Sequence, residues 1–297
     1  MKSGLVTLAG RPNVGKSTLF NRLLGKKISI VSRHPATTRL RLLGVTTSQR
    51  GQIVFVDTPG FELPRYQLGQ HMKKTVINAL QEADLVLMVI TVSGWKKEDE
   101  EALEEIRKLS KKAFLIINKI DLLPRRELLL SLIDESRHRY NFDEIYPCSA
   151  LKEKSWERLR EKIFDFLPEG PVLFPEEETT GNLPREYLLA EVLREKVLAE
   201  TYQEVPQSVA VEIEEVSPGR NNPGVLLVQA SIIVDREQLR PIIIGRGGSK
   251  LKSIGKKARE EMEQMLGQPV YLQTRVKVIP RWRDRPDIFR RFGYGEG

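Results

Sequence analysis

The sequence contains a single cysteine and no long apolar run. Because Cys148 has no second cysteine to pair with, an internal disulfide bond and a cysteine-rich metal site are excluded. The longest apolar run, Leu85 to Val92, is far shorter than the roughly 20 residues that a membrane-spanning helix needs. Met1 leads almost directly into the first expected strand, with no signal-peptide pattern. We therefore expect a soluble, cytosolic protein.

Basic side chains outnumber acidic ones by about two to one at the carboxyl end. Residues 1–235 contain 33 basic and 33 acidic side chains, whereas residues 236–297 contain 15 basic and 7 acidic ones. The whole net charge of +8 therefore lies in the last fifth of the chain. A segregated basic segment suggests a polyanionic partner. The alternative is a solvated charged surface without a partner.

Residues 10–17 fit the template of a phosphate-binding loop, in which a glycine and four residues precede Gly-Lys-Ser. The apolar residues Leu5 to Ala9 predict a buried strand before the loop, and Thr18 to Leu24 predict a helix after it. Such a loop binds phosphate through backbone N–H groups at a helix N-terminus. The pattern predicts that Lys16 reaches the terminal phosphates and that Ser17 holds Mg²⁺. The predicted nucleotide contacts in this stretch are Gly10, Arg11, Pro12, Asn13, Val14, Gly15, Lys16, Ser17 and Thr18.

A second polar motif, Asp57-Thr58-Pro59-Gly60, follows a hairpin predicted over residues 43–57. Asp57 stands at the carboxyl end of an apolar strand, where it can hold Mg²⁺ through water. Gly60 can offer its N–H to the terminal phosphate.

Helices predicted over residues 67–83 and 98–109 alternate with buried strands over residues 85–92 and 114–117. This alternation predicts a mainly parallel sheet with helices on both faces. Ligands of such sheets bind at the carboxyl ends of the strands.

Asn118-Lys119-Ile120-Asp121 follows one of these strands directly. The Asp121 carboxylate can accept two hydrogen bonds from guanine, and adenine offers no such pair of donors. A mismatch of this kind discriminates by about 10⁴–10⁵. Asn118 can contact the base edge and brace the phosphate loop, and the stem of Lys119 can cover the base.

A further strand over residues 145–148 precedes Ser149, Ala150 and Leu151, and the Ala150 N–H can bond the guanine carbonyl oxygen. A helix predicted over residues 153–166 closes the domain.

These four motifs, in this order, resemble those of translation-factor-class GTPases over residues 1–167. The resemblance implies GTP and GDP as ligands, Mg²⁺ as cofactor and hydrolysis of GTP to GDP and phosphate. It implies Mg²⁺ ligation by Ser17, Thr38 and Asp57, with Thr37 as the neighbouring alternative to Thr38. The implied catalytic residues are Lys16, Asn13, Thr38 and Gly60.

Phe61 stands where Ras-type proteins have a water-orienting glutamine, which it cannot replace. The chain is therefore similar to GTPases with a hydrophobic residue there, and we expect slow unassisted turnover. In several of these the asparagine equivalent to Asn13 helps to bind K⁺. A structural role for Asn13 is the alternative.

The rest of the chain predicts a linker over residues 168–184 and a smaller α+β domain over residues 185–297. An amphipathic helix (185–201) precedes strands at 208–213 and 225–234, helices at 236–244 and 249–266, and a strand at 270–278. With a Gly-x-x-Gly loop between its two central helices, this order resembles a KH domain of the second topology. KH loops clamp the backbone of single-stranded nucleotides.

Residues 240–259 carry seven basic side chains and no acidic one. The implied RNA contacts are Gly245, Arg246, Gly247, Gly248, Lys250, Lys252, Lys256 and Lys257. Ile243, Ile244 and Ile254 could face the bases or pack in the core. The tail from Pro280 to Tyr294 interleaves arginines with aromatic residues, which suits stacking on bases. Packing on its own domain is the alternative.

The predicted fold class is therefore α/β, with a P-loop GTPase domain whose sheet is mixed and mainly parallel, joined to a smaller type II KH domain. This combination resembles the Era-like GTPase family over essentially the entire chain. The resemblance implies a monomeric factor in assembly of the small (30S) ribosomal subunit that binds RNA, not DNA, near the 3′ end of 16S ribosomal RNA and acts in its maturation. It admits peripheral association with the inner membrane face at most.

Two other functions stay open. One is an RNA-binding module whose nucleotide domain is a sensor, with hydrolysis uncoupled from RNA binding. The other is a tRNA-modifying GTPase, which the KH pattern disfavours.

Overall fold

The computed structural model describes residues 1–61, 64, 66–180, 183–219 and 222–294, and the chain divides into two compact units. The first unit comprises most of residues 1–182, and the second comprises residues 183–294 together with the short segments 32–35 and 64–71. The domain boundaries expected at residues 167 and 185 stay a prediction, and residues 181–182 and 295–297 lie outside the described residues. No helix in the described ranges is long and apolar enough to cross a membrane.

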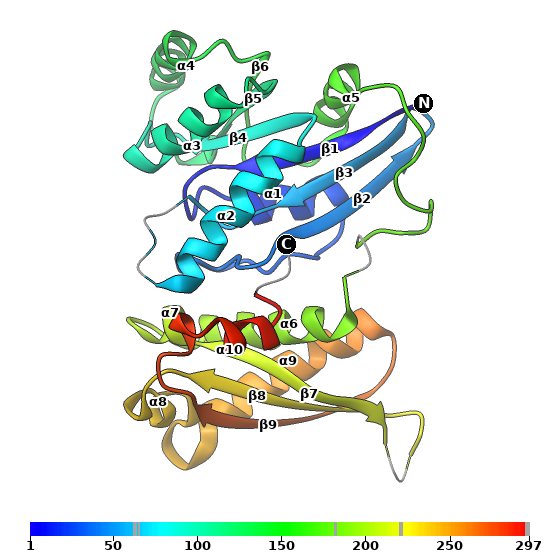
Figure 1. The fold of residues 1–297 in the computed structure, drawn as a ribbon, viewed down its shortest axis with the longest axis vertical. Helices are drawn as coiled ribbons and strands as arrows, with labels where there is room; N and C mark the ends of the chain where they lie inside the picture. Colours follow the sequence, from blue (N-terminus) through cyan, green and yellow to red (C-terminus); the bar gives the residue numbers. More distant parts are fainter. Residues whose placement is uncertain (62–63, 65, 181–182, 220–221, 295–297) are drawn as a thin grey trace. The chain divides into compact units, whose positions relative to one another are not determined.

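The first unit is built on a six-stranded sheet with the order β2-β3-β1-β4-β5-β6 (Figure 1). All neighbouring strands are parallel except β2 and β3, which form the predicted hairpin. The mixed, mainly parallel sheet is thereby confirmed. Its strands are β1 (Lys2–Ala9), β2 (Leu42–Ser48), β3 (Gly51–Asp57), β4 (Leu85–Thr91), β5 (Ala113–Asn118) and β6 (Glu144–Pro147).

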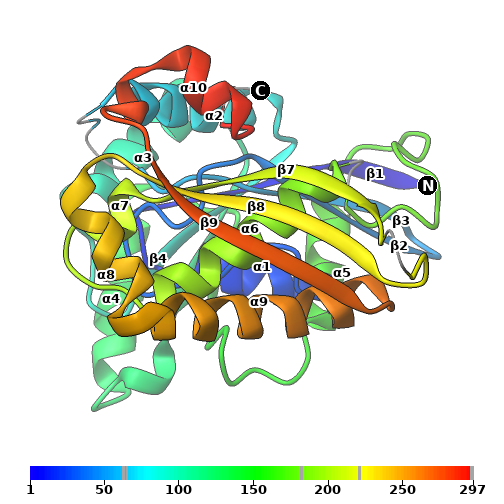
Figure 2. The ribbon, with the colours of Figure 1, turned by 90° about the horizontal axis from the view of Figure 1, so that it is seen from below.

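Helices cover both faces of this sheet (Figures 1 and 2). Apolar side chains of α2, α3 and α4 form one core with alternate residues of β4 and β5, while Phe114 on the other face meets Phe166 of α5. The loop-proximal helix α1 packs its Phe20 and Leu24 side chains over Gly44 of β2. The helices are α1 (Lys16–Leu24), α2 (Gln67–Glu82), α3 (Lys97–Lys108), α4 (Glu127–Arg139) and α5 (Glu157–Phe166).

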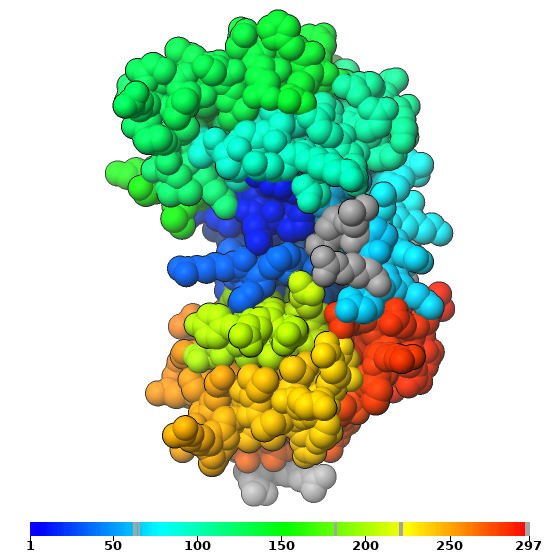
Figure 3. Space-filling model, turned by 90° about the vertical axis from the view of Figure 1, so that its left-hand side faces the viewer, coloured from blue at the N-terminus to red at the C-terminus, as the bar shows by residue number. Residues whose placement is uncertain are grey.

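Two features of the first unit differ from the sequence prediction. Helix α4, which is part of the exposed surface in Figure 3, was not predicted, although Leu129, Leu132 and Ile133 follow helical spacing. Helix α5 begins at Glu157, four residues later than expected, because residues 153–156 are irregular. The single cysteine, Cys148, is fully buried just after β6. Its N–H donates to the Ile117 oxygen (2.9 Å), and its oxygen accepts from the Ile120 N–H (3.2 Å).

Residues 168–180, which make up most of the expected linker, pack along the sheet of the first unit. The Gln52 side chain donates to the Phe174 oxygen (2.9 Å) and accepts from the Leu173 N–H (2.8 Å). The Val45 N–H donates to the Thr179 oxygen (3.1 Å). Because β2 and β3 supply these partners, this segment is held along its length.

The second unit has a three-stranded sheet, β7-β8-β9, with β8 antiparallel to β7 and parallel to β9. Helices α6 and α9 pack on this sheet (Figure 2). The expected helices and strands occur in the expected order, and two short helices, α7 and α10, were not predicted. Its elements are α6 (Arg185–Ala199), α7 (Val205–Ser208), β7 (Ala210–Pro218), β8 (Leu226–Val234), α8 (Arg240–Ile244), α9 (Ser249–Leu266), β9 (Val270–Val278) and α10 (Pro286–Arg291).

The amphipathic character predicted for α6 is wrong. Its residues 189–195 are buried without interruption, and three of them are charged. The helix tolerates this because Arg194 donates two hydrogen bonds to Glu191 (2.7 and 2.6 Å). Buried charges persist when they are paired in this way.

Candidate nucleotide site and KH loop

The phosphate loop runs from the end of β1 to the start of α1 with a backbone that favours glycine. Gly10 (φ 138°) and Gly15 (φ 101°) have the positive φ values that L-residues rarely adopt. A Cβ atom at Gly10 would lie 2.3 Å from the Val89 oxygen, and one at Gly15 would lie 2.3 Å from Asn118 Nδ2. Both glycines therefore let the loop pass close to β4 and β5.

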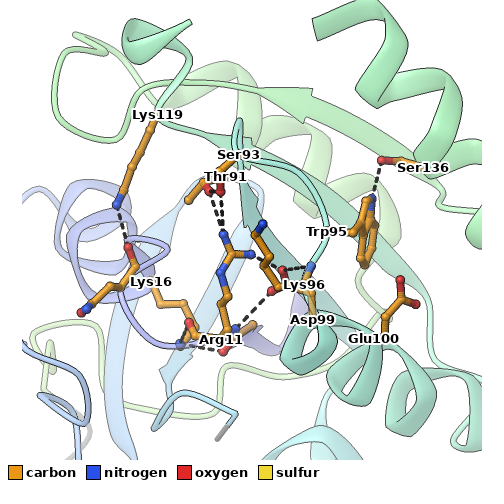
Figure 4. Close-up of polar contacts among 12 residues, drawn as sticks. Arg11, Lys16, Thr91, Ser93, Trp95, Lys96, Asp99, Glu100, Lys119 and Ser136 are labelled. Atoms are coloured by element: carbon orange, nitrogen blue, oxygen red, sulfur yellow. Dashed lines mark hydrogen bonds and ion pairs between the residues drawn. The ribbon is translucent and has the colours of Figure 1, made fainter. Parts of the chain in front are cut away.

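Lys16 lies across this loop. Its Nζ donates to the oxygens of Gly10 (2.9 Å) and Arg11 (3.0 Å), and the residue is 5% exposed. On the outer side of the loop, Lys119 Nζ donates to the Asn13 oxygen (2.7 Å), as Figure 4 shows. One lysine thus lies inside the loop and the other holds its outer edge.

Three predicted magnesium ligands lie in one cluster. Ser17 Oγ is 2.8 Å from Thr38 Oγ1, and Ser17 also hydrogen-bonds Asp57. The Thr38 hydroxyl therefore lies where it could share a metal ion with Ser17. Ser29, which the sequence did not indicate, donates to Asp57 Oδ2 (2.8 Å). Its irregular surroundings gave no signal for that role.

The chemistry of this cluster fits Mg²⁺. Asp57 is fully buried, and its Oδ1 has no hydrogen-bond partner among the described residues. Burial raises the pKa of Asp57, while hydrogen bonds from Ser17 and Ser29 and the charge of Lys16 lower it. A hard cation that takes oxygen ligands would stabilise the ionised form. No cluster of three or more His, Cys, Asp or Glu side chains in the described ranges could hold a metal.

The segment after Asp57 lies directly on the phosphate loop. A Cβ atom at Gly60 would lie 2.7 Å from the Pro12 nitrogen, and the Phe61 N–H donates to the Gly10 oxygen (3.1 Å). Thr58 is buried and donates to the Leu8 oxygen (2.8 Å). The Phe61 ring packs in the core with side chains of α2 and is 2% exposed. Phe61 therefore serves packing, and its ring carries no group that could hydrogen-bond a water.

Asn118 joins the phosphate loop to the predicted base site. Its Nδ2 donates to the Val14 oxygen (2.8 Å), and its Oδ1 accepts from the N–H groups of Lys119 (2.7 Å) and Ala150 (2.9 Å). The Ala150 N–H, which the sequence assigned to guanine, thus has Asn118 as partner here. The bracing role predicted for Asn118 agrees with these contacts.

Asp121 lies beside the loop formed by residues 149–151. A hydrogen bond from Ser149 is the main cause that lowers the pKa of Asp121, and Lys152 Nζ lies 3.7 Å from its Oδ2. The carboxylate is therefore ionised at neutral pH and ready to accept hydrogen bonds. A cleft of about 930 Å³ is lined by Asp121 and Ser149 and continues along the start of α4.

Arg22 of α1 was missed by the sequence interpretation. Its Nε donates to the Ala150 oxygen (3.2 Å), and its terminal nitrogen donates to the Leu151 oxygen (3.1 Å). The helix that follows the phosphate loop thereby holds the loop beside the base site. A basic residue on an exposed helix gave no sign of this in the sequence.

The Gly-x-x-Gly loop connects α8 to α9 in the second unit. Gly245, Gly247 and Gly248 all have positive φ (73°, 56° and 80°). Ile243 and Ile254 are fully buried, and Ile244 is partly buried against the same core, so all three pack in the core of this unit.

The basic residues near this loop fall into two groups. Lys257 pairs with Glu200, and Lys256 lies 3.9 Å from Glu260. For Arg246, Lys250 and Lys252 the described part of the chain shows no ion pair. The second group therefore has its charge available for an external anion.

The aromatic residues of the tail pack on their own unit. Trp282, Phe292 and Tyr294 are each at most 3% exposed, and their ring centroids lie 5.7–6.3 Å apart. Trp282 Nε1 donates to the Ser208 oxygen (2.8 Å). The tail was expected either to stack on bases or to pack on its own domain. In the structure its aromatic side chains pack on their own domain.

Family models match both units. Residues 5–119 match the family described as 50S ribosome-binding GTPase, and residues 204–283 match the KH domain.

Full-length relatives are similar over both units together. GTPase Era of Aquifex aeolicus (strain VF5) is 48% identical over 300 residues, covering 99% of each chain. GTPase Era of Heliobacterium modesticaldum (strain ATCC 51547 / Ice1) is 42% identical over 297 residues, covering 100% of this chain and 98% of the relative.

Two solved structures match with a TM-score of 0.96, 47% identity and complete coverage of both chains. One is a variant of Aquifex aeolicus Era bound to GDP·AlF4⁻. The other is Era in complex with MgGDPNP and nucleotides 1506–1542 of 16S ribosomal RNA.

Proposed function

The chain belongs to the Era family of GTPases, and on that premise we propose that it binds RNA near the 3′ end of 16S ribosomal RNA under the control of guanine nucleotide. The process we propose is assembly of the 30S subunit and maturation of the 16S 3′ end, in the cytosol. The observation that carries the proposal is the Gly-x-x-Gly loop, beside which Arg246, Lys250 and Lys252 have no ion pair within the described residues. These cations suit the phosphates of a single strand.

The small subunit is the preferred ribosomal partner. The name of the matching GTPase family refers to the 50S subunit, but that model covers residues 5–119 only. The Era structure with 16S ribosomal RNA is similar over the whole chain, including the KH unit. The comparison that includes the RNA-binding unit carries more weight for an RNA partner.

GTP hydrolysis depends, in this proposal, on position and charge. Lys16 and the N–H groups of residues 10–17 bind the phosphates and stabilise the charge that develops on them. Ser17, Thr38 and Asp57 hold Mg²⁺, which neutralises charge on the phosphate oxygens when it is bound. The N–H of Gly60 and the loop residue Asn13 complete the site, and Asn13 is the residue through which K⁺ would act.

The base is selected at Asp121. Its ionised carboxylate accepts from guanine, and Asn118 and Lys119 hold the surrounding loops in place. Turnover without a partner is slow, because Phe61 is buried and supplies no group that orients water.

The proposal is tested by measuring affinity for a short single-stranded RNA that copies the 3′ end of 16S ribosomal RNA. The full chain is compared with a GTP analogue, with GDP and without nucleotide, at one salt concentration. A scrambled RNA and the Arg246→Asp, Gly247→Asp variant serve as controls.

Tighter, sequence-selective binding in the GTP-analogue state, lost in the variant, is the expected result. Equal binding in all states would leave RNA binding intact and favour the uncoupled nucleotide sensor. No preference over the scrambled RNA would contradict the proposed target.

A further inference from the structure

The Arg11 side chain leaves the phosphate loop and runs to the beginning of α3 (Figure 4). Its guanidinium forms an ion pair with Asp99 and donates to Thr91 Oγ1 (2.9 Å) and Ser93 Oγ (3.0 Å) at the end of β4. The Arg11 backbone N–H is 3.4 Å from Asp99 Oδ1. Asp99 thus holds Arg11 at both its backbone and its side chain.

Asp99 is entirely buried in this position. Burial raises the pKa of Asp99, whereas the charge of Arg11 lowers it. Its carboxylate also accepts from the Lys96 N–H (3.1 Å), at the start of α3. A buried carboxylate without a cationic partner is costly, so the two side chains keep each other in place.

The start of α3 is itself attached to α4. Trp95 Nε1 donates to Ser136 Oγ (3.0 Å), and Arg139 of α4 forms an ion pair with Glu100. Figure 4 shows Trp95 and Glu100. The Arg139 guanidinium also lies 5.3 Å from the centre of the Trp95 ring. Arg11 is therefore bound to the start of α3, which contacts with α4 hold in place.

The position of Arg11 bears on Lys16 directly. The Arg11 oxygen and the Gly10 oxygen both accept hydrogen bonds from the Lys16 ammonium group. Any rotation of the peptide groups at these residues would move the acceptors and redirect the ammonium group. A misplacement of about 1 Å at such a group costs up to 10²-fold in rate.

We propose that Asp99 is a positioning residue for the nucleotide phosphates, which acts by holding Arg11 and thereby the carbonyl groups that orient Lys16. The proposal rests on the nucleotide site described above. It also assigns the Arg11 side chain a structural partner in place of the nucleotide. Because Asp99, Thr91 and Ser93 bind its guanidinium, Arg11 does not act on the phosphates as an arginine finger.

The test uses the full-length variants Arg11→Met, Asp99→Asn and the double variant. Asparagine keeps the shape of Asp99 and can still accept from the Lys96 N–H, which preserves the start of α3. Glu104→Gln is the matched control, since it removes the carboxylate of an exposed ion pair with Arg107 on the same helix. For each protein we would measure dissociation constants for GDP, a GTP analogue and guanosine, kcat and KM for GTP, and the melting temperature.

Each single variant is expected to weaken GDP and GTP-analogue binding by about tenfold, as loss of a charged hydrogen bond predicts. The double variant should lose about tenfold as well, because one interaction is removed only once. Guanosine affinity should stay within twofold of wild type in all variants, since guanosine has no phosphate. Glu104→Gln should match wild type in every measurement.

Four results would overturn the proposal. The first is nucleotide binding within twofold of wild type in both single variants. The second is a loss in Asp99→Asn alone, which would assign the effect to the start of α3. The third is an additive loss in the double variant, and the fourth is an equal loss of guanosine affinity, which would indicate general destabilisation. Failure of the wild-type protein to bind GDP would instead contradict the proposed function itself.

Discussion

In the proposed site, Asp121 is the residue on which the choice of base would depend. Its carboxylate is partly exposed at the mouth of the cleft, is hydrogen-bonded by Ser149 and lies near Lys152. These contacts keep it ionised while leaving it able to accept from a ligand. A guanine bound there would replace water around the charge, whereas adenine would leave the charge without donors.

Asp121→Asn is expected to abolish the preference for GTP over ATP, because an amide presents a donor where guanine needs an acceptor. The loss of discrimination should exceed about 10²-fold and can reach the 10⁴–10⁵-fold that polar mismatches give. Competition of GTP and ATP against a fluorescent GDP provides the measurement. Glu153→Gln, a second carboxylate that lines the same cleft, is the control. An unchanged GTP preference in Asp121→Asn would rule out the proposed base recognition.

Individual site residues were predictable where a motif fixes their spacing along the chain. The loop around Lys16 and the residues Asn118 and Asp121 lie together as expected, because each follows a strand of one parallel sheet. Ser29 and Arg22 could not be predicted. Their roles arise from contacts with segments 28 and 128 residues away, and no local pattern encodes such pairs.

Elements were predictable to the extent that their apolar residues repeat. The bounds expected for α9 and β9 agree with the structure, since a glycine lies at each end of α9 and alternation marks β9. Helix α4 was not predicted because exposed leucines hide the periodic pattern of its buried side. Leu128 and Leu130 are 50% and 68% exposed, whereas Leu132 is buried. The amphipathic pattern predicted for helix α6 was wrong because paired charged side chains are buried among its apolar residues.

The lysines of α9 should contribute unequally to RNA binding. Lys252→Gln is expected to reduce the slope of log affinity against log salt by about 0.7, the value for one phosphate contact on a single strand. Lys257→Gln should change the slope less, because Glu200 already neutralises that ammonium group. Salt titrations of the two variants on the same RNA decide the matter. Equal changes would show that the ion pair opens when RNA binds.

The end of β6 should make stability depend on alkaline pH. Burial raises the pKa of Cys148 from its usual value of 9.0 to about 12. The thiol therefore stabilises the fold fully below pH 9, and this contribution falls as pH rises from 9 toward 12, where only the unfolded chain ionises. Between pH 8 and pH 10 the free energy of unfolding should fall by about 1.4 kcal/mol more in wild type than in Cys148→Ala. Parallel pH profiles for the two proteins would contradict the buried, neutral thiol.

At the scale of the whole molecule, charge and ligand sites are divided between the two units. The net charge of +8 belongs to residues 236–297, and the nucleotide motifs belong to residues 10–151. The fold class of each unit was predictable, because each has its own order of elements and its own core. Any coupling between nucleotide and RNA therefore has to act between separate cores.

Such coupling must be reciprocal. If a GTP analogue tightens RNA binding by a given factor relative to protein without nucleotide, RNA must tighten binding of that analogue by the same factor. Titrating the analogue with and without saturating RNA measures the second factor independently. A factor of about 5 to 150 corresponds to the usual coupling range of roughly 1–3 kcal/mol. Unequal factors would show that a third equilibrium, such as self-association, takes part.

The burial of the single thiol has a practical consequence for spectroscopy. Cys148 is fully buried and is the only cysteine in the sequence, so the folded surface presents no thiol to a maleimide dye or a spin label. A cysteine introduced at an exposed position would then be the sole site of attachment, without prior removal of the native one. Two introduced cysteines, one in each unit, would carry a pair of labels. The distance between the labels could then be followed as nucleotide and RNA are added, with the rest of the sequence unchanged.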